Sequence, residues 1–132
     1  MNKSSPEKAS KFWLEKSVED LDTAKALLDA GQYNWCAFIC QQSLEKVLKA
    51  GYVKKFKKIP PYIHKLERLT DILRLEPPEE ILASIIEIDK YYLATRYPSY
   101  KAAVNITDKA EAKEIYHKTE EAYEWLKQVL EL

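Results

Sequence analysis

Residues 33–57 read YNWCAFICQQSLEKVLKAGYVKKFK, and this stretch decides the fold. Small and apolar side chains recur in it at three- and four-residue steps, which is the period of an α-helix. One line along the predicted helix consists of Ala37, Gln41, Leu44, Leu48 and Gly51. This line is flanked by Cys36, Cys40, Val47 and Tyr52. An apolar band of this width needs helical partners along its length, so the stretch predicts the central helix of an all-α protein.

The residues before this stretch predict an antiparallel partner helix over residues 4–30. A hydroxyl cap, a proline and an acid begin it at Ser4, Ser5, Pro6 and Glu7. Its predicted apolar stripe consists of Leu14, Val18, Leu21, Ala24 and Leu28. Gly31 ends this helix, and the short break before Tyr33 makes the two helices an antiparallel pair.

Three further helices are predicted after residue 57. Pro60-Pro61 forces a turn before a short helix over residues 64–73, and Pro77-Pro78 opens a fourth helix. The inner residues of that helix are predicted to be Ile81, Leu82, Ile85, Ile88, Tyr92 and Leu93. It ends at Tyr97, because the residue before a proline avoids helical angles. Thr107 or Asp108 caps a last helix with the stripe Ala112, Ile115, Thr119, Ala122, Leu126 and Val129.

These elements predict a single domain over residues 1–132. Its fold class is all-α, as an antiparallel up-and-down bundle of four long helices plus one short helix. Two Gly and six Pro leave little material for hairpins or glycine-rich phosphate loops, which argues against β-sandwich and doubly wound folds. Neither a secretory signal nor a run of about eighteen apolar residues is visible, so we expect a cytoplasmic protein with no membrane partner.

The charge of the chain is balanced overall but unevenly distributed. The 21 basic and 21 acidic residues exclude coating of nucleic acid or membrane by bulk attraction. Between Lys46 and Arg74, however, nine basic residues stand against two acids. This stretch is either a solvated basic surface or an electropositive patch for phosphates or an acidic partner.

The two cysteines are predicted to be small core residues. Cys36 and Cys40 share a helix face, but the side chains of such a pair run side by side and do not converge on a disulfide. Both histidines, His64 and His117, lie far from them in the sequence. We therefore expect neither a metal site nor a cofactor.

Polar residues interrupt the apolar lines at a few positions. Gln41 and Asp89 occupy core-facing phases of their helices, and Arg96 follows Asp89 on the same face if the helix persists. Buried polar groups need partners, so one hypothesis is a hydrogen-bonded cluster in which Asp89 is the buried partner. The other is a cleft in which Arg96 meets a phosphate. His64 is expected to brace the turn after the double proline in preference to a catalytic role, and His117 to lie on the surface.

Several of these segments, taken in order, resemble one known family. They are Trp13, then Gly31-Gln32-Tyr33, then residues 41–50 (QQSLEKVLKA), then His64-Lys65-Leu66, then Arg96-Tyr97-Pro98. This series resembles the HEPN domain family, over about residues 8–130, and in particular its nucleotidyltransferase-associated branch.

The resemblance implies a helical bundle that is commonly a homodimer and is often encoded beside a minimal nucleotidyltransferase. Members are proposed to bind nucleotides or to present substrate to that partner, and many in toxin–antitoxin pairs are metal-independent ribonucleases. The ribonucleases carry an arginine followed four to six residues later by a histidine. Arg96 matches the arginine, but Tyr100, Lys101 and Ala102 stand where the histidine belongs.

We therefore predict a non-catalytic protein that binds a nucleotide such as ATP or serves a nucleotidyltransferase as its substrate-binding or regulatory partner. The predicted contacts are Arg96, Tyr97 and Tyr100, with a polar rim of Gln41, Glu45, Lys46 and Lys49 and with His64 nearby. One alternative is an RNA endonuclease that uses Arg96 with Tyr100 or with His64. Another is a structural module that only dimerises and docks a partner.

Overall fold

The computed structural model describes residues 5–96 and 105–132, and the side chains of residues 6–94 and 105–132. Five helices make up this part of the chain. They are α1 (Ser5–Asp29), α2 (Tyr33–Phe56), α3 (Leu66–Ile72), α4 (Glu79–Arg96) and α6 (Lys109–Val129). Four are long and α3 has seven residues. The predicted all-α bundle of four long helices and one short helix is therefore confirmed.

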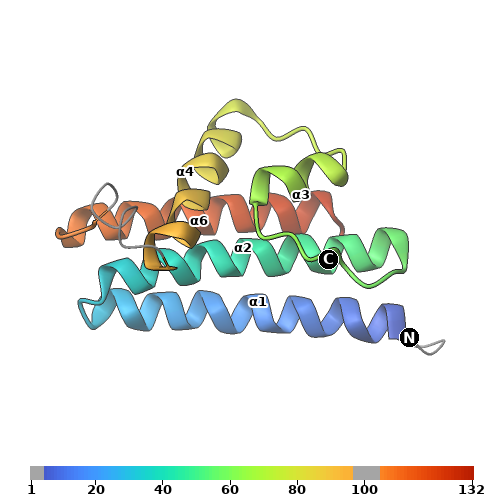
Figure 1. Ribbon diagram of the computed structural model, residues 1–132, viewed down its shortest axis with the longest axis horizontal. Coiled ribbons are helices and arrows are strands. Elements are labelled where there is room, and N and C mark those ends of the chain that lie inside the picture. Colours follow the sequence, from blue (N-terminus) through green and yellow to red (C-terminus); the bar gives the residue numbers. More distant parts are fainter. Residues whose placement is uncertain (1–4, 97–104) are drawn as a thin grey trace.

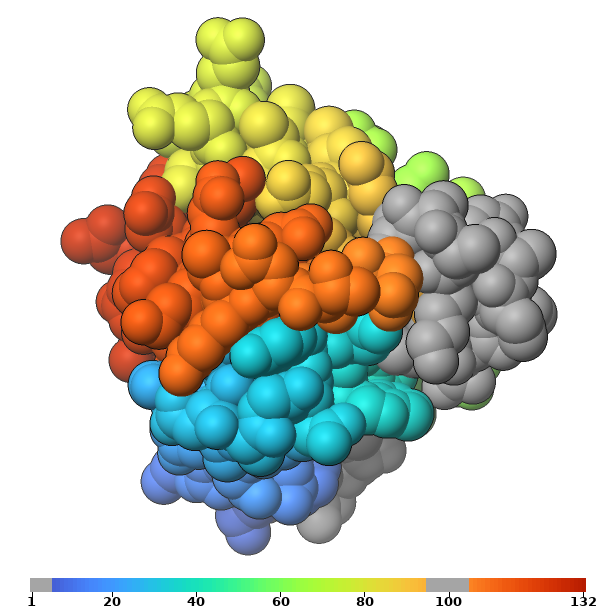
Figure 2. Space-filling view, turned by 90° about the vertical axis from the view of Figure 1, so that its left-hand side faces the viewer, coloured from blue at the N-terminus to red at the C-terminus, as the bar shows by residue number. Residues whose placement is uncertain are grey.

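Helix α2 lies at the centre of the bundle. Figure 1 shows α1, α2 and α6 running side by side, with α4 crossing them obliquely and α3 above the end of α2. In the space-filling view, α6 lies between α4 and the pair α1 and α2 (Figure 2). More than half of α2 is buried, which is why its apolar band extends around so much of the helix.

The predicted helix ends agree closely with the structure. Gly31 has φ +76°, a left-handed conformation that suits glycine and closes α1. Asp108 caps α6 by accepting a hydrogen bond of 2.7 Å from the backbone N–H of Ala110. Helix α4 ends at Arg96, one residue before the predicted boundary. The short helix was predicted to begin at His64, but α3 begins at Leu66, because His64 and Lys65 form the extended approach to it.

Three predicted core residues are wrong. Val18, Leu93 and Val129 are 43%, 37% and 45% exposed. In α1 the inward position belongs to Ser17, which is fully buried. Its hydroxyl donates to the backbone O of Leu14 at 2.5 Å and accepts from the hydroxyl of Tyr123 at 2.8 Å. A search for apolar residues does not select a serine whose hydroxyl is hydrogen-bonded in this way, so the predicted stripe of α1 is wrong at this one position, while Ala24 and Leu28 are buried as predicted.

The cysteines lie in the core, as predicted. Cys36 and Cys40 are free thiols with at most 1% of their surface exposed. A hydrogen bond between the two thiols, together with burial, raises the pKa of the Cys40 thiol well above its usual value. A protonated, buried thiol is not a nucleophile, so Cys40 contributes to packing; the same hydrogen bond lowers the pKa of the Cys36 thiol, which is also buried.

Candidate functional site

The two polar interruptions predicted from the sequence meet in one network. The side-chain N–H groups of Gln41 donate to the backbone O of His64 at 2.8 Å and to Oδ1 of Asp89 at 3.4 Å. Both carboxylate oxygens of Asp89 accept from the backbone N–H of Leu66 at 3.0 Å. Burial raises the pKa of Asp89 above its ordinary 3.8, and these hydrogen bonds oppose the shift. The network fixes the backbone of residues 64–66 at the entry to α3.

The ring of His64 is held separately from its backbone. Nδ1 lies 3.2 Å from both carboxylate oxygens of Glu45. The ring stacks on Tyr92, with centroids 4.8 Å apart and planes at 16°, and it meets Tyr62 edge-on at 4.9 Å. The predicted bracing role of His64 thus has a geometric basis, because the residue connects α2, α4 and the loop that precedes α3.

Glu45 and Lys49 form a buried ion pair beside this ring. Their side chains are each 6% exposed, and Nζ of Lys49 lies 3.0 Å from Oε2 of Glu45. The ammonium also lies 5.6 Å from the centroid of the Trp13 ring, within the range of a cation–π contact. Glu45, Lys46 and Lys49 were predicted to belong to a polar rim. In the structure Glu45 and Lys49 are buried. Lys46 is partly exposed, and its Nζ lies 2.6 Å from Oδ2 of Asp20.

These groups surround a cavity of about 500 Å³ between α1, α2 and the loop over residues 59–64, which we call the aromatic cavity. Its walls are mostly apolar and aromatic, with charged groups at a few points. It is lined by Ala9, Trp13, Glu45, Lys46, Lys49, Val53, Ile59, Pro60, Pro61, Tyr62 and His64. Tyr62 is 92% exposed and Ile59 is 73% exposed. A hollow of this size with a few placed polar groups is typical of a small-molecule site.

The structure brings some of the predicted site residues together and leaves others apart. Four of them line the aromatic cavity: Glu45, Lys46, Lys49 and His64. Gln41 and Asp89 do not line it; Gln41 holds the backbone of His64 and contacts Asp89. The three residues predicted to contact an anion or a base are not among those whose side chains the structure describes. The side chain of Arg96 and the whole of Tyr97 and Tyr100 lie outside the described residues.

Two aromatic wall residues were missed as ligand contacts in the sequence. Trp13 was noted only as a point of family resemblance, and Tyr62 only as a neighbour of His64. The available signal was the composition of the loop, in which Tyr62 follows two prolines that stiffen the chain. The position of Trp13 opposite this loop depends on how α1 packs on α2, which a local pattern does not encode.

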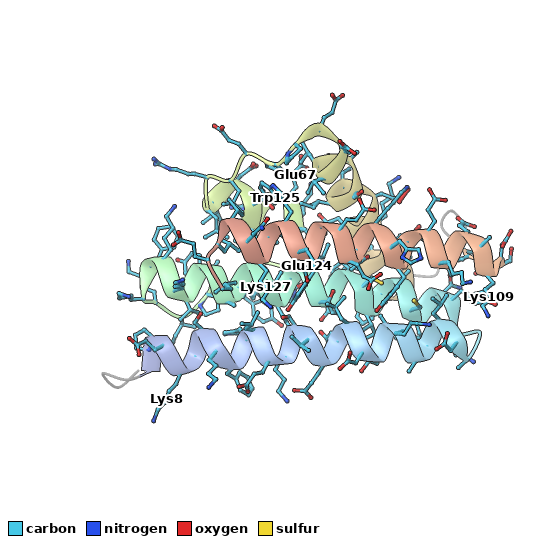
Figure 3. The ribbon with its side chains drawn as sticks, turned by 180° about the vertical axis from the view of Figure 1, so that it is seen from behind. Lys8, Glu67, Lys109, Glu124, Trp125 and Lys127 are labelled. Atoms are coloured by element: carbon cyan, nitrogen blue, oxygen red, sulfur yellow. The ribbon has the colours of Figure 1, made fainter. Side chains whose placement is uncertain are left out.

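The basic stretch is partly neutralised within the molecule. Lys46 and Lys49 have acid partners, Lys55 donates to the backbone O of Leu73 at 3.1 Å, and Lys54 donates to the backbone O of Glu131. The lysines at the end of α2 lie at the same end of the bundle as the start of α1 (Figure 1). Lys8 adds a further basic side chain at this end, whereas Lys109 lies at the opposite end (Figure 3).

Metal and membrane sites are not found in the described residues. Across residues 5–96 and 105–132, no three His, Cys, Asp or Glu side chains are grouped so that they could hold a metal ion. The helices of the same ranges include none that is both long and apolar enough to cross a membrane. His117 lies on the surface, as predicted, with Nδ1 3.2 Å from Oε1 of Glu120.

One family model matches most of this chain, and two solved structures share its fold. A family model described as HEPN domain matches residues 10–129. The crystal structure of TT1696 from Thermus thermophilus is similar, with a TM-score of 0.75 and 25% identity over 90% of this chain and 96% of that one. ST0689, described as an archaeal HEPN homologue, has a TM-score of 0.70 and 24% identity over 92% of this chain and 97% of its own. No curated protein matches the sequence.

Proposed function

This chain belongs to the HEPN domain family, and we propose that it binds a nucleotide in the aromatic cavity and has no catalytic activity of its own. The observation that carries the proposal is the composition of that cavity. Three ring systems, those of Trp13, Tyr62 and His64, line the same hollow as two lysines. Aromatic rings stack on nucleobases, and ammonium groups bind phosphates.

The aromatic walls fit a nucleobase better than they fit the phosphates. Pro60, Pro61 and Val53 share this lining with the rings, so the interior is mainly apolar. A flat base with hydrogen-bonding edges is therefore the part of the nucleotide that we place inside. Tyr62 lies at the mouth, since nearly all of its side chain is exposed, and we expect it to close over the base.

The phosphates are assigned to the lysine side of the cavity. Each ammonium has three N–H donors, so Lys46 and Lys49 keep donors available after pairing with Asp20 and Glu45. Lys57 and Lys58 lead directly into the loop that forms the opposite wall, and both are exposed. The charge that a nucleotide brings is therefore met at the rim by Lys46, Lys57 and Lys58, which water still reaches, while Lys49 lies deeper in the wall.

The ring of His64 is held on Nδ1 by Glu45 and packs against Tyr92 and Tyr62, so it offers a fixed aromatic surface to a base. A carboxylate on Nδ1 leaves Nε2 able to accept a proton. The proposal that the chain is not catalytic therefore rests on the missing histidine after Arg96 and not on the surroundings of His64. The ribonuclease alternative requires Arg96 or Tyr100 and is decided by incubating the protein with bulk RNA beside an Arg96→Ala variant.

Isothermal titration with ATP, ADP, AMP and adenosine tests nucleotide binding. Tyr62→Ala removes an exposed wall residue, so the fold should persist while affinity falls by about tenfold, the loss of one stacking contact. Phe12→Ala is the matched control, because Phe12 is an aromatic residue of α1 that is 54% exposed and does not line this cavity. Absence of heat with all four ligands, or equal losses in the two variants, would contradict the proposal.

We further propose that the chain docks a minimal nucleotidyltransferase, with the bound nucleotide presented to it. One exposed aromatic side chain supports a docking role: Trp35 is 52% exposed and packs edge-on against the partly buried Phe38, which stacks on Tyr92. Homodimerisation is part of the same proposal, and both are measured by size-exclusion chromatography with light scattering, alone and after co-expression with such an enzyme. A monomer that retains no nucleotidyltransferase would count against this part.

A further inference from the structure

A second cavity lies on the other side of His64, between α3 and α4. Its volume is about 470 Å³, well within the range of small-molecule sites. We call it the α3–α4 cavity; it is lined by His64, Lys65, Glu67, Ile86, Asp89, Lys90, Tyr92 and Leu93. Figure 3 shows Glu67 on this side of the molecule, away from α1.

One wall of this cavity is apolar and unusually open to water. Ile86 is 42% exposed and Leu93 is 37% exposed, seven residues apart on α4, and the ring of Tyr92 lies beside them. Residues seven apart lie on the same face of a helix. Apolar side chains that border a hollow lose their contact with water when an apolar group fills it, so this wall favours a ligand with a hydrophobic group.

The remaining lining residues carry both charges in equal number. Asp89 is directed toward α3, where both oxygens accept from the backbone of Leu66. Burial raises the pKa of Asp89, and the charge of Lys65 is one of the contributions that oppose this rise. Lys90 and Glu67 remain, and neither takes part in an ion pair within the part of the chain that the structure describes. A ligand with a single charge would leave one of these two groups without a counter-charge.

We propose that the α3–α4 cavity binds a small zwitterion with a hydrophobic side chain, that is, an aromatic or branched-chain amino acid. The side chain packs on Ile86, Tyr92 and Leu93, the carboxylate pairs with Lys90, and the ammonium pairs with Glu67. This site is separate from the nucleotide site, although the two share one wall residue.

The shared residue is His64, which lines both cavities. Its backbone is held by Gln41, but its ring contacts Glu45 on one side and Tyr92 on the other. An amino acid packed on Tyr92 therefore changes the environment of the His64 ring. If the proposed nucleotide site is correct, on which this step rests, the two ligands change each other's affinity by the same factor.

The test uses L-tryptophan as the probe and NMR of the two histidine rings as the readout, with no nucleotide present. The His64 signals are expected to shift on titration, while those of His117, whose side chain is 69% exposed, are not. Tryptamine and indole-3-propionate each lack one charge and should bind about fivefold more weakly, as expected for one exposed ion pair. Unmoved His64 signals, or equal binding of all three compounds, overturn the proposal.

A pair of variants checks the location of the site. Ile86→Glu places a carboxylate in the apolar wall and should weaken binding of L-tryptophan by about tenfold or more. Val18→Glu is the control, because Val18 is 43% exposed on α1 and lines neither cavity. Equal affinity in the two variants overturns the assignment.

Titration with AMP in the presence of L-tryptophan then separates the two sites. If L-tryptophan binds and AMP does not, the nucleotide proposal fails and the amino-acid site stands. If AMP binds and L-tryptophan does not, the amino-acid site fails alone. If both bind, a change of about twofold or more in each affinity, equal in the two directions, supports coupling through His64; independent binding refutes the coupling step.

Discussion

The buried ion pair between Glu45 and Lys49 gives the sharpest stability prediction. Both side chains are 6% exposed, and Nζ lies 3.0 Å from Oε2. Removing one partner leaves a charge in a wall that water hardly reaches, which costs about 3–5 kcal/mol in comparable buried pairs. Since Glu45 also holds His64 at 3.2 Å, Glu45→Met loses two contacts and Lys49→Met loses one.

We expect each single variant to lower the free energy of unfolding by about 3 kcal/mol, equivalent to roughly 10 °C in melting temperature for a domain of this size. The double variant Glu45→Met/Lys49→Met removes both charges and fills the space with apolar atoms. It should therefore be more stable than either single variant. Urea denaturation followed by circular dichroism measures all four proteins of this double-mutant cycle.

An exposed pair in the same molecule serves as the control. Lys25 and Asp29 have the same spacing of four residues and an Nζ–Oδ1 distance of 2.9 Å, but their side chains are 53% and 59% exposed. The equivalent cycle on this pair should show no measurable coupling, because water screens it. Single-variant losses below about 1 kcal/mol at residues 45 and 49, or a double variant whose loss equals the sum of the two, would refute the reasoning.

Two further predictions concern Ser17, which is buried, and Asp89, which is partly buried. Ser17→Ala leaves the buried hydroxyl of Tyr123 without its partner and should cost about 1–2 kcal/mol in urea denaturation; a loss no larger than that of Tyr123→Phe would contradict this. Folding raises the pKa of the Asp89 carboxyl above 3.8. Between pH 3.8 and the pKa of the folded state, the folded protein therefore keeps the Asp89 carboxyl protonated while the unfolded chain has lost that proton. The free energy of unfolding consequently falls as the pH rises through this range. Asp89→Asn, which keeps an acceptor for Leu66, should flatten that fall, whereas Asp89→Ala should cost about 1–3 kcal/mol at every pH; unfolding curves between about pH 4 and 7 separate these outcomes.

Local signals in the sequence predicted most of the helical framework. Gly31 and Asp108 determine helix ends through their own backbone and side-chain chemistry, and such effects can be recognised within a few residues. Gln41 and Asp89 were recognisable for a similar reason, because a polar residue in an apolar helical phase needs a partner. That these two residues contact each other agrees with one of the two hypotheses.

Features that depend on packing between helices were not predictable in this way. Glu45 and Lys49 have the spacing of an ordinary surface ion pair, and only the cover supplied by Trp13 and the loop over residues 59–64 buries them. Ser17 took the inward position expected for Val18 because Tyr123, from a distant helix, satisfies its hydroxyl. Both cavities arise from the same cause, since their walls come from segments far apart in the sequence.

The most direct test of nucleotide binding in the aromatic cavity is NMR of the three tryptophan indole N–H groups during titration with AMP. Trp13 lines this cavity, whereas Trp35 is exposed at the start of α2 and Trp125 packs against the core in α6. Substitution of each tryptophan by phenylalanine assigns the three signals. We predict a saturable shift of the Trp13 signal with the other two unmoved. Binding of AMP that leaves the Trp13 signal in place would contradict the account.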